Sequence, residues 1–69
     1  MNKGTVKWFN EQRGYGFIQP AEGGKDVFVH VSAVERSGLR SLSDGQKISY
    51  ELQTDRRTGK ISAVNLKAA

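Results

Sequence analysis

Apolar and polar residues alternate in short runs along this chain, and turn-forming residues interrupt the runs about every ten positions. Because successive side chains of a strand point to opposite faces, this alternation is typical of half-buried strands. Glycines and charged residues that favour turns separate the runs at residues 11–14, 22–25 and 55–59. The pattern predicts an all-β fold with strands over residues 3–10, 15–20, 26–31, 47–54 and 60–67.

One helical segment is expected between the third and fourth strands. Ser32 and Glu35 have the Ser-x-x-Glu spacing of a helix capping box, with Ser32 as the cap. Gly38 follows as a residue suited to end a helix. The sequence therefore predicts a single short helical turn, followed by a long loop that reaches residue 45.

The first strand does not follow simple alternation. Val6 and Trp8 have the same parity, yet a small branched side chain and a large indole suit different faces. We expect a bend or bulge between them. The later strands alternate well, and their expected inward residues are Ile48, Tyr50, Leu52, Val64 and Leu66.

Five short strands in 69 residues are too few for two full sheets, and closing them into a barrel removes exposed edges. The length and strand count fit a five-stranded antiparallel Greek-key barrel of the oligonucleotide-binding (OB) type. An SH3-like barrel fits the same pattern. The chain length predicts one domain, residues 1–69.

The second and third strands separate two kinds of side chain by parity. Branched apolar residues share one face and form an expected core, namely Ile18, Val27, Val29 and Val31. Flat rings occupy the other face, namely Tyr15, Phe17, Phe28 and His30. With Trp8 they make up a predicted ring cluster, which we interpret as a stacking surface for unpaired bases.

The amino-acid composition favours some classes of binding partner and excludes others. Eleven Lys and Arg against seven Asp and Glu give a net charge of +4, which favours polyanions such as nucleic acid. The chain has no Cys and one His, so disulfides are excluded and a zinc site lacks ligands; we expect no metal and no cofactor. No long apolar run or signal peptide is apparent, so we expect a cytoplasmic protein without a membrane partner.

Three motifs in register resemble the bacterial cold-shock protein family, and the resemblance covers nearly the whole chain. They are Lys7-Trp8-Phe9-Asn10, Arg13-Gly14-Tyr15-Gly16-Phe17-Ile18 and Val27-Phe28-Val29-His30. The loop from Ser41-Leu42 to Gly45-Gln46 and the run Ala63-Val64-Asn65 are also similar. The resemblance implies a monomer that binds single-stranded RNA and DNA with low sequence specificity. It also implies an RNA chaperone, with roles in antitermination or translation during cold adaptation.

Polar positions around the rings complete the predicted interface. Lys7 and Arg13 flank the rings and match family positions, whereas Arg56 and Lys60 come from the last hairpin. The resemblance implies contacts with base edges for Asn10 and Asp26; the alternative role for Asp26 is to cap the turn before its strand. Where many relatives carry aromatic residues this chain has Val31 and Leu39, which predicts a smaller footprint or weaker binding than in the most aromatic-rich relatives. The expected nucleic-acid-binding residues are Lys7, Trp8, Asn10, Arg13, Tyr15, Phe17, Asp26, Phe28, His30, Leu39, Arg56 and Lys60.

Two other classes of function fit the sequence less well. An SH3-like module grips polyproline segments with exposed aromatic residues, but its groove favours acidic rather than basic flanks. A small hydrolase or nuclease needs clustered carboxylates, and Asp26, Asp44 and Asp55 are scattered. We therefore expect no catalytic residues and no small-molecule substrate.

Overall fold

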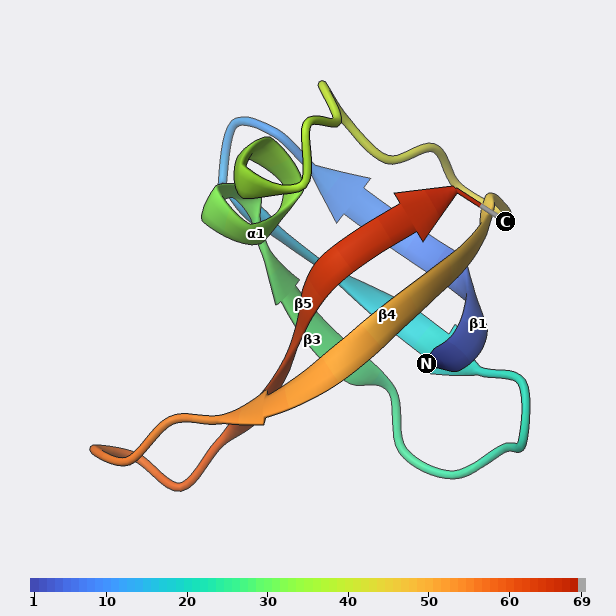
Figure 1. Ribbon diagram of the computed structural model, residues 1–69. Coiled ribbons are helices and arrows are strands. Elements are labelled where there is room, and N and C mark those ends of the chain that lie inside the picture. Colours follow the sequence, from blue (N-terminus) through green and yellow to red (C-terminus); the bar gives the residue numbers. More distant parts are fainter. Residues whose placement is uncertain (69) are drawn as a thin grey trace.

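The computed structural model describes residues 1–68, so Ala69, the last residue of the predicted domain, lies outside the described part. Five strands close into a barrel in the order β1-β2-β3-β5-β4, with one short helix at one end (Figure 1). The predicted all-β barrel is confirmed, and every strand begins and ends within one residue of its predicted limits. The elements are β1 (Asn2–Asn10), β2 (Tyr15–Pro20), β3 (Val27–His30), α1 (Val31–Arg36), β4 (Lys47–Thr54) and β5 (Ile61–Ala68).

The expectation that all strand pairs are antiparallel is wrong for one pair. β3 runs parallel to β5, and Phe28 pairs with Ser62 in their register. The registered pairing is short because β3 has four residues, whereas β4 and β5 have eight each and continue past it. The β4–β5 hairpin therefore projects from the barrel (Figure 1).

The predicted helix is present, but Ser32 is not its cap. His30 is the N-cap, and its imidazole accepts a hydrogen bond from the backbone N–H of Ser32. The helix starts earlier than predicted because β3 leads directly into α1 at Val31. Its end is as predicted: Gly38 has a φ of 81°, and its N–H donates to Glu35 in a glycine-terminated cap.

The predicted bulge in β1 is also confirmed. Val6 pairs with Ile18 and Trp8 pairs with Phe17, so Lys7 is an extra residue in β1 at this point. The extra residue changes which face the next side chain takes. Val6 is consequently buried in the barrel, while Trp8 is directed to the outer face of β1 and β2.

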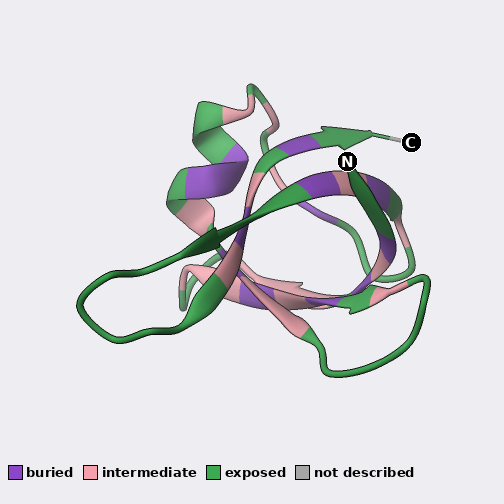
Figure 2. Ribbon diagram, turned by 60° about the horizontal axis from the view of Figure 1, so that its bottom comes forward, coloured by how far each residue is buried: buried purple, intermediate pink, exposed green. Residues whose placement is uncertain are grey.

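The core is an apolar cluster that fills the barrel and extends to α1 and Leu42. Buried residues, which include this cluster, are purple in Figure 2. Burying each of its larger side chains stabilises the fold by about 1.5–3 kcal/mol. The fully buried members with the largest side chains are Tyr50, Ile18, Ile48, Val6, Val29 and Val34.

Some predicted core positions are wrong. Leu52 is 50% exposed because it lies on the projecting part of the hairpin, where no strand covers it. Val31 is only half-buried because it belongs to α1 rather than to β3. Val27 and Val64 are half-buried at the margin of the core, and Ala63 takes the fully buried place expected for Val64.

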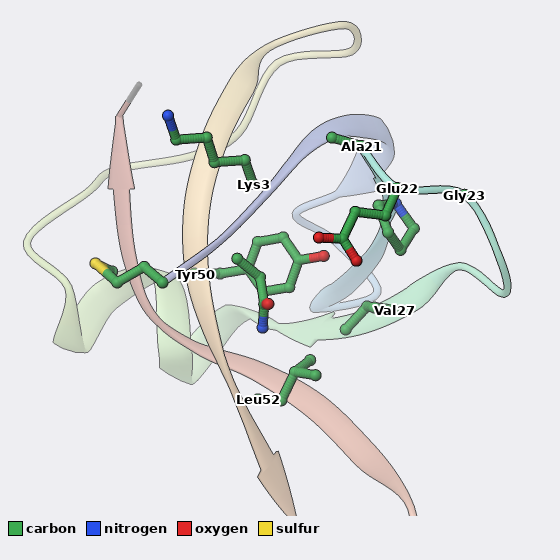
Figure 3. A pocket seen from close by; sticks show the side chains of 10 residues that line it. Lys3, Ala21, Glu22, Gly23, Val27, Tyr50 and Leu52 are labelled. Carbon is green, nitrogen blue, oxygen red and sulfur yellow. The ribbon is translucent and has the colours of Figure 1, made fainter.

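A hollow of about 380 Å³ lies between the start of β1, the β2–β3 loop and β4. None of the ring cluster lines it. Figure 3 shows the Tyr50 hydroxyl and the Glu22 carboxylate directed toward each other across this hollow. Burial, and secondly the negative charge of Glu22, raise the pKa of Tyr50 above its ordinary value of 10.0.

This raised pKa predicts a loss of stability in alkaline solution. The unfolded chain ionises Tyr50 at its ordinary pKa of 10.0, while the folded chain holds the hydroxyl neutral to higher pH. The stabilisation is fully present below about pH 10 and is lost as the pH rises through the folded pKa. Urea unfolding of the parent and Tyr50→Phe at about pH 8 and pH 11 measures it. The parent should lose more stability between these pH values, and equal losses would contradict the prediction.

Candidate nucleic-acid interface

The five residues of the ring cluster lie together on the outer face of β1, β2 and β3. The pairing register places them there, because Trp8 pairs with Phe17, Phe17 with Phe28 and Tyr15 with His30. Directly paired residues present their side chains on the same face of a sheet. The predicted segregation of rings from the apolar core is therefore confirmed.

The rings contact one another in a continuous patch. Ring centroids are 5.4 Å apart for Trp8 and Phe17, 5.7 Å for Tyr15 and Phe28, and 6.3 Å for Phe28 and His30. Tyr15 and Phe28 are stacked, with 28° between their planes, while Trp8 and Tyr15 meet edge to face. These contacts hold the side chains in place before any ligand arrives.

The cluster is accessible to solvent. Trp8, Tyr15, Phe17 and Phe28 are half-buried and His30 is exposed. Each ring therefore has one side supported by the barrel or by another ring, and the remaining surface is free to contact a flat ligand.

His30 connects the ring cluster to the helix. Its Nδ1 accepts from the Ser32 N–H at 3.1 Å and lies 2.9 Å from the Ser32 hydroxyl oxygen. Because Nδ1 acts as an acceptor, the neutral ring carries its proton on Nε2. That N–H is left available as a donor beside Phe28.

Two predicted site residues form an ion pair with each other. Lys7 Nζ lies 3.0 Å from Asp26 Oδ2, joining the bulge of β1 to the segment that precedes β3. Both side chains are partly exposed, so the pair contributes about 0–1 kcal/mol to stability. A phosphate that approached Lys7 or a base that approached Asp26 would replace this contact at little cost.

Asn10 and Arg13 belong to the turn between β1 and β2. The Asn10 Oδ1 accepts a hydrogen bond from the Arg13 N–H at 3.1 Å, so the Asn10 side chain orders the turn. The Arg13 side chain is exposed two residues before Tyr15. The structure thus gives Asn10 a structural contact in addition to its predicted contact with a base.

Leu39 does not lie with the rings. Its N–H donates to the Val34 carbonyl at 3.1 Å, and its side chain packs against the core just beyond α1. The apolar contact is the usual companion of a helix that ends in glycine. The contact of Leu39 with nucleic acid stays a prediction.

The two cations of the last hairpin lie on different sides of β5. Lys60 lines a hollow of about 530 Å³ together with Phe17, Phe28 and Asp26. Arg56 lines a separate hollow of about 350 Å³ beside Gln53 and Ser62.

The sequence did not predict two residues that line the hollow beside Lys60. Lys25 and Ile61 complete the wall beside Lys60, and Ile61 is 53% exposed. The β2–β3 loop and the projecting hairpin carry them, so only the arrangement of these two loops brings them next to the rings.

The described residues lack two other kinds of feature. Between residues 1 and 68 there is no group of three His, Asp or Glu side chains able to hold a metal ion. The same residues contain no helix of the length and apolar character needed to cross a membrane.

A small closed β-barrel that displays a patch of rings flanked by cations defines a nucleic-acid-binding protein of the OB type. Comparison with known proteins agrees. The family model described as the "'Cold-shock' DNA-binding domain" matches residues 2–69. The chain belongs to the cold-shock domain family, whose members bind nucleic acid and are not enzymes.

Similar proteins cover the same length. Probable cold shock protein y4cH of Sinorhizobium fredii is 69% identical over 68 residues, 99% of each chain. Cold shock protein CspA of Rhizobium meliloti is 62% identical over 69 residues, all of both chains. Cold shock-like protein CspC of Shigella flexneri is 54% identical over 66 residues, 96% of this chain and 93% of the relative.

Proposed function

We propose that this protein binds unpaired stretches of RNA and single-stranded DNA with little sequence specificity and acts as an RNA chaperone. The observation that supports the proposal is the ring cluster: five rings in mutual contact lie outside the core on one face of the barrel. A base that stacks on such a ring contributes about 1–3 kcal/mol whatever its identity. A surface of this kind selects unpaired bases, because bases in a duplex are already stacked.

Exposed cations around the rings would neutralise the phosphates. Lys7, Arg13 and Lys60 surround the cluster, and Lys7 would exchange its Asp26 partner for a phosphate. The freed Asp26 carboxylate would accept a hydrogen bond from a base edge. Affinity should fall as salt rises, with a log–log slope of about −0.7 for each phosphate contacted.

The strength of stacking suits a chaperone. One stacked base is worth about as much as one base-pair step of a duplex, which averages about 1.4 kcal/mol. The protein would compete with weak or imperfect pairing and then release the strand. We propose that a monomer consisting of a single cold-shock domain does this in the cytoplasm, in support of antitermination or translation during cold adaptation.

Opening of an RNA hairpin tests this proposal. A short hairpin with a fluorophore and a quencher on its ends brightens when its stem opens. We expect excess protein to raise the fluorescence and lower the melting temperature of a hairpin with a weak stem. A variant that lacks two rings, Phe17→Ala with Phe28→Ala, should have little effect on the same hairpin. Unchanged melting with the parent protein would contradict the chaperone role.

A further inference from the structure

The ring cluster is one part of a longer row that crosses all five strands. Trp8 on β1 pairs with Phe17 on β2, and Phe17 pairs with Phe28 on β3. Phe28 then pairs with Ser62 on β5, and Ser62 pairs with Gln53 on β4. Since paired residues share a face, all five side chains lie on the outer surface of the barrel. The row changes from three rings to a hydroxyl and an amide.

The polar end of this row is hollowed on both sides. Gln53 and Ser62 line a hollow of about 250 Å³ that reaches His30 and Arg36. The same two residues line the hollow of about 350 Å³ that reaches Arg56. A nucleic-acid strand that continues from Phe28 and His30 toward β5 would therefore meet the side chains of Gln53 and Ser62. The guanidinium groups of Arg36 and Arg56 lie on either side of them.

Gln53 and Ser62 are available for a ligand. Asn65, in the same hollow, donates its amide to Glu51 Oε1 at 3.0 Å. Within residues 1–68, by contrast, neither the Gln53 amide nor the Ser62 hydroxyl has a hydrogen-bond partner in the protein. Gln53 is exposed and Ser62 is half-buried.

We propose that Gln53 and Ser62 form a base-reading subsite for the nucleotide that follows the stacked ones, with Arg36 and Arg56 beside its phosphates. This inference rests on the proposed function and refines it. A glutamine amide offers a donor and an acceptor side by side, which matches the adjacent N7 acceptor and N6 amino donor of adenine. Arginine suits the flanking phosphates because its planar fork donates two parallel hydrogen bonds. The subsite binds the base edge of adenine. It therefore gives one nucleotide position of the bound strand a preference for adenine, while the other positions stay unselective.

The test compares adenine with purine, which stacks similarly but lacks the amino group. One or the other replaces a single uracil of an eight-nucleotide uridine oligomer, at each position in turn, and binding is followed by Trp8 fluorescence. We expect one position, beyond the stacked bases, at which adenine binds about threefold to tenfold more tightly than purine. At the remaining positions the two should agree within about twofold.

Variants assign that difference to Gln53. Gln53→Val should abolish it, and Gln53→Met, which keeps the side-chain length, should do the same. Gln19→Val is the matched control, because Gln19 is an exposed glutamine on β2 outside the row. It should leave the difference intact.

The possible results distinguish failure of the proposed subsite from failure of the proposed binding of single-stranded nucleic acid. Binding of the uridine oligomer without any selective position would overturn the subsite alone. A selective position that persists in both Gln53 variants would also overturn it. Failure of the parent to bind the uridine oligomer would instead refute the proposed function.

Discussion

Phe17→Ala and Phe28→Ala should each weaken binding of a short uridine or thymidine oligomer by about 1–3 kcal/mol without unfolding the protein. Each ring offers a stacking surface to the ligand, and both side chains lie half-buried outside the core cluster. Truncating either ring removes the stacking interaction with one base but leaves the side chains inside the barrel unchanged. Titration of Trp8 fluorescence gives the affinity, and urea unfolding gives the stability.

Ile18→Ala is the matched control because Ile18 follows Phe17 on β2 but faces inward and is 0% exposed. It should lower the free energy of unfolding by about 2–5 kcal/mol, as buried truncations do. The two kinds of variant should therefore divide cleanly between binding and stability. If Phe17→Ala or Phe28→Ala destabilised the fold as much as Ile18→Ala, the ring concerned would belong to the core.

Gly16→Ala should also destabilise the fold strongly. A Cβ at this position would clash with the Trp8 carbonyl oxygen and lie 2.8 Å from the Phe9 Cα, both of them backbone atoms that cannot move aside. Overpacking commonly costs about 1–3 kcal/mol, and a clash with backbone places this change at or above the upper end. A domain this small has little stability to lose, so we expect Gly16→Ala to be largely unfolded at room temperature.

Circular dichroism and urea unfolding measure this effect, with Gly23→Ala as the comparison. A Cβ at Gly23 meets no atom within 4 Å, and its φ of 91° makes backbone strain the main cost, about 1–2 kcal/mol. Gly23→Ala should remain folded. A Gly16→Ala protein as stable as Gly23→Ala would show that β1 and β2 are not packed as closely as described.

The strands and the ring cluster could be predicted because both depend on local alternation. A period of two assigns Tyr15 and Phe17 to one face and Ile18 to the other wherever the strand lies in the sheet. The bulge in β1 was predictable for a similar reason, since Val6 and Trp8 could not share a face.

What escaped prediction depends on contacts between distant segments. Ser32 has the right spacing for a cap, but β3 passes directly into α1 and makes His30 the cap. Leu52 has the right parity for the core, but β3 is too short to cover it. Ser62 and Gln53 carry no distinguishing local signal, and only the register of β3, β5 and β4 aligns them with the rings.

The central claim is that the exposed ring cluster binds unpaired bases. Titrating the protein with an eight-nucleotide single strand, and separately with the duplex formed from the same sequence, tests it most directly because Trp8 is itself part of the cluster. We expect strong, saturable quenching of Trp8 fluorescence by the single strand and little change with the duplex. Equal quenching by both, or none by the single strand, would contradict it.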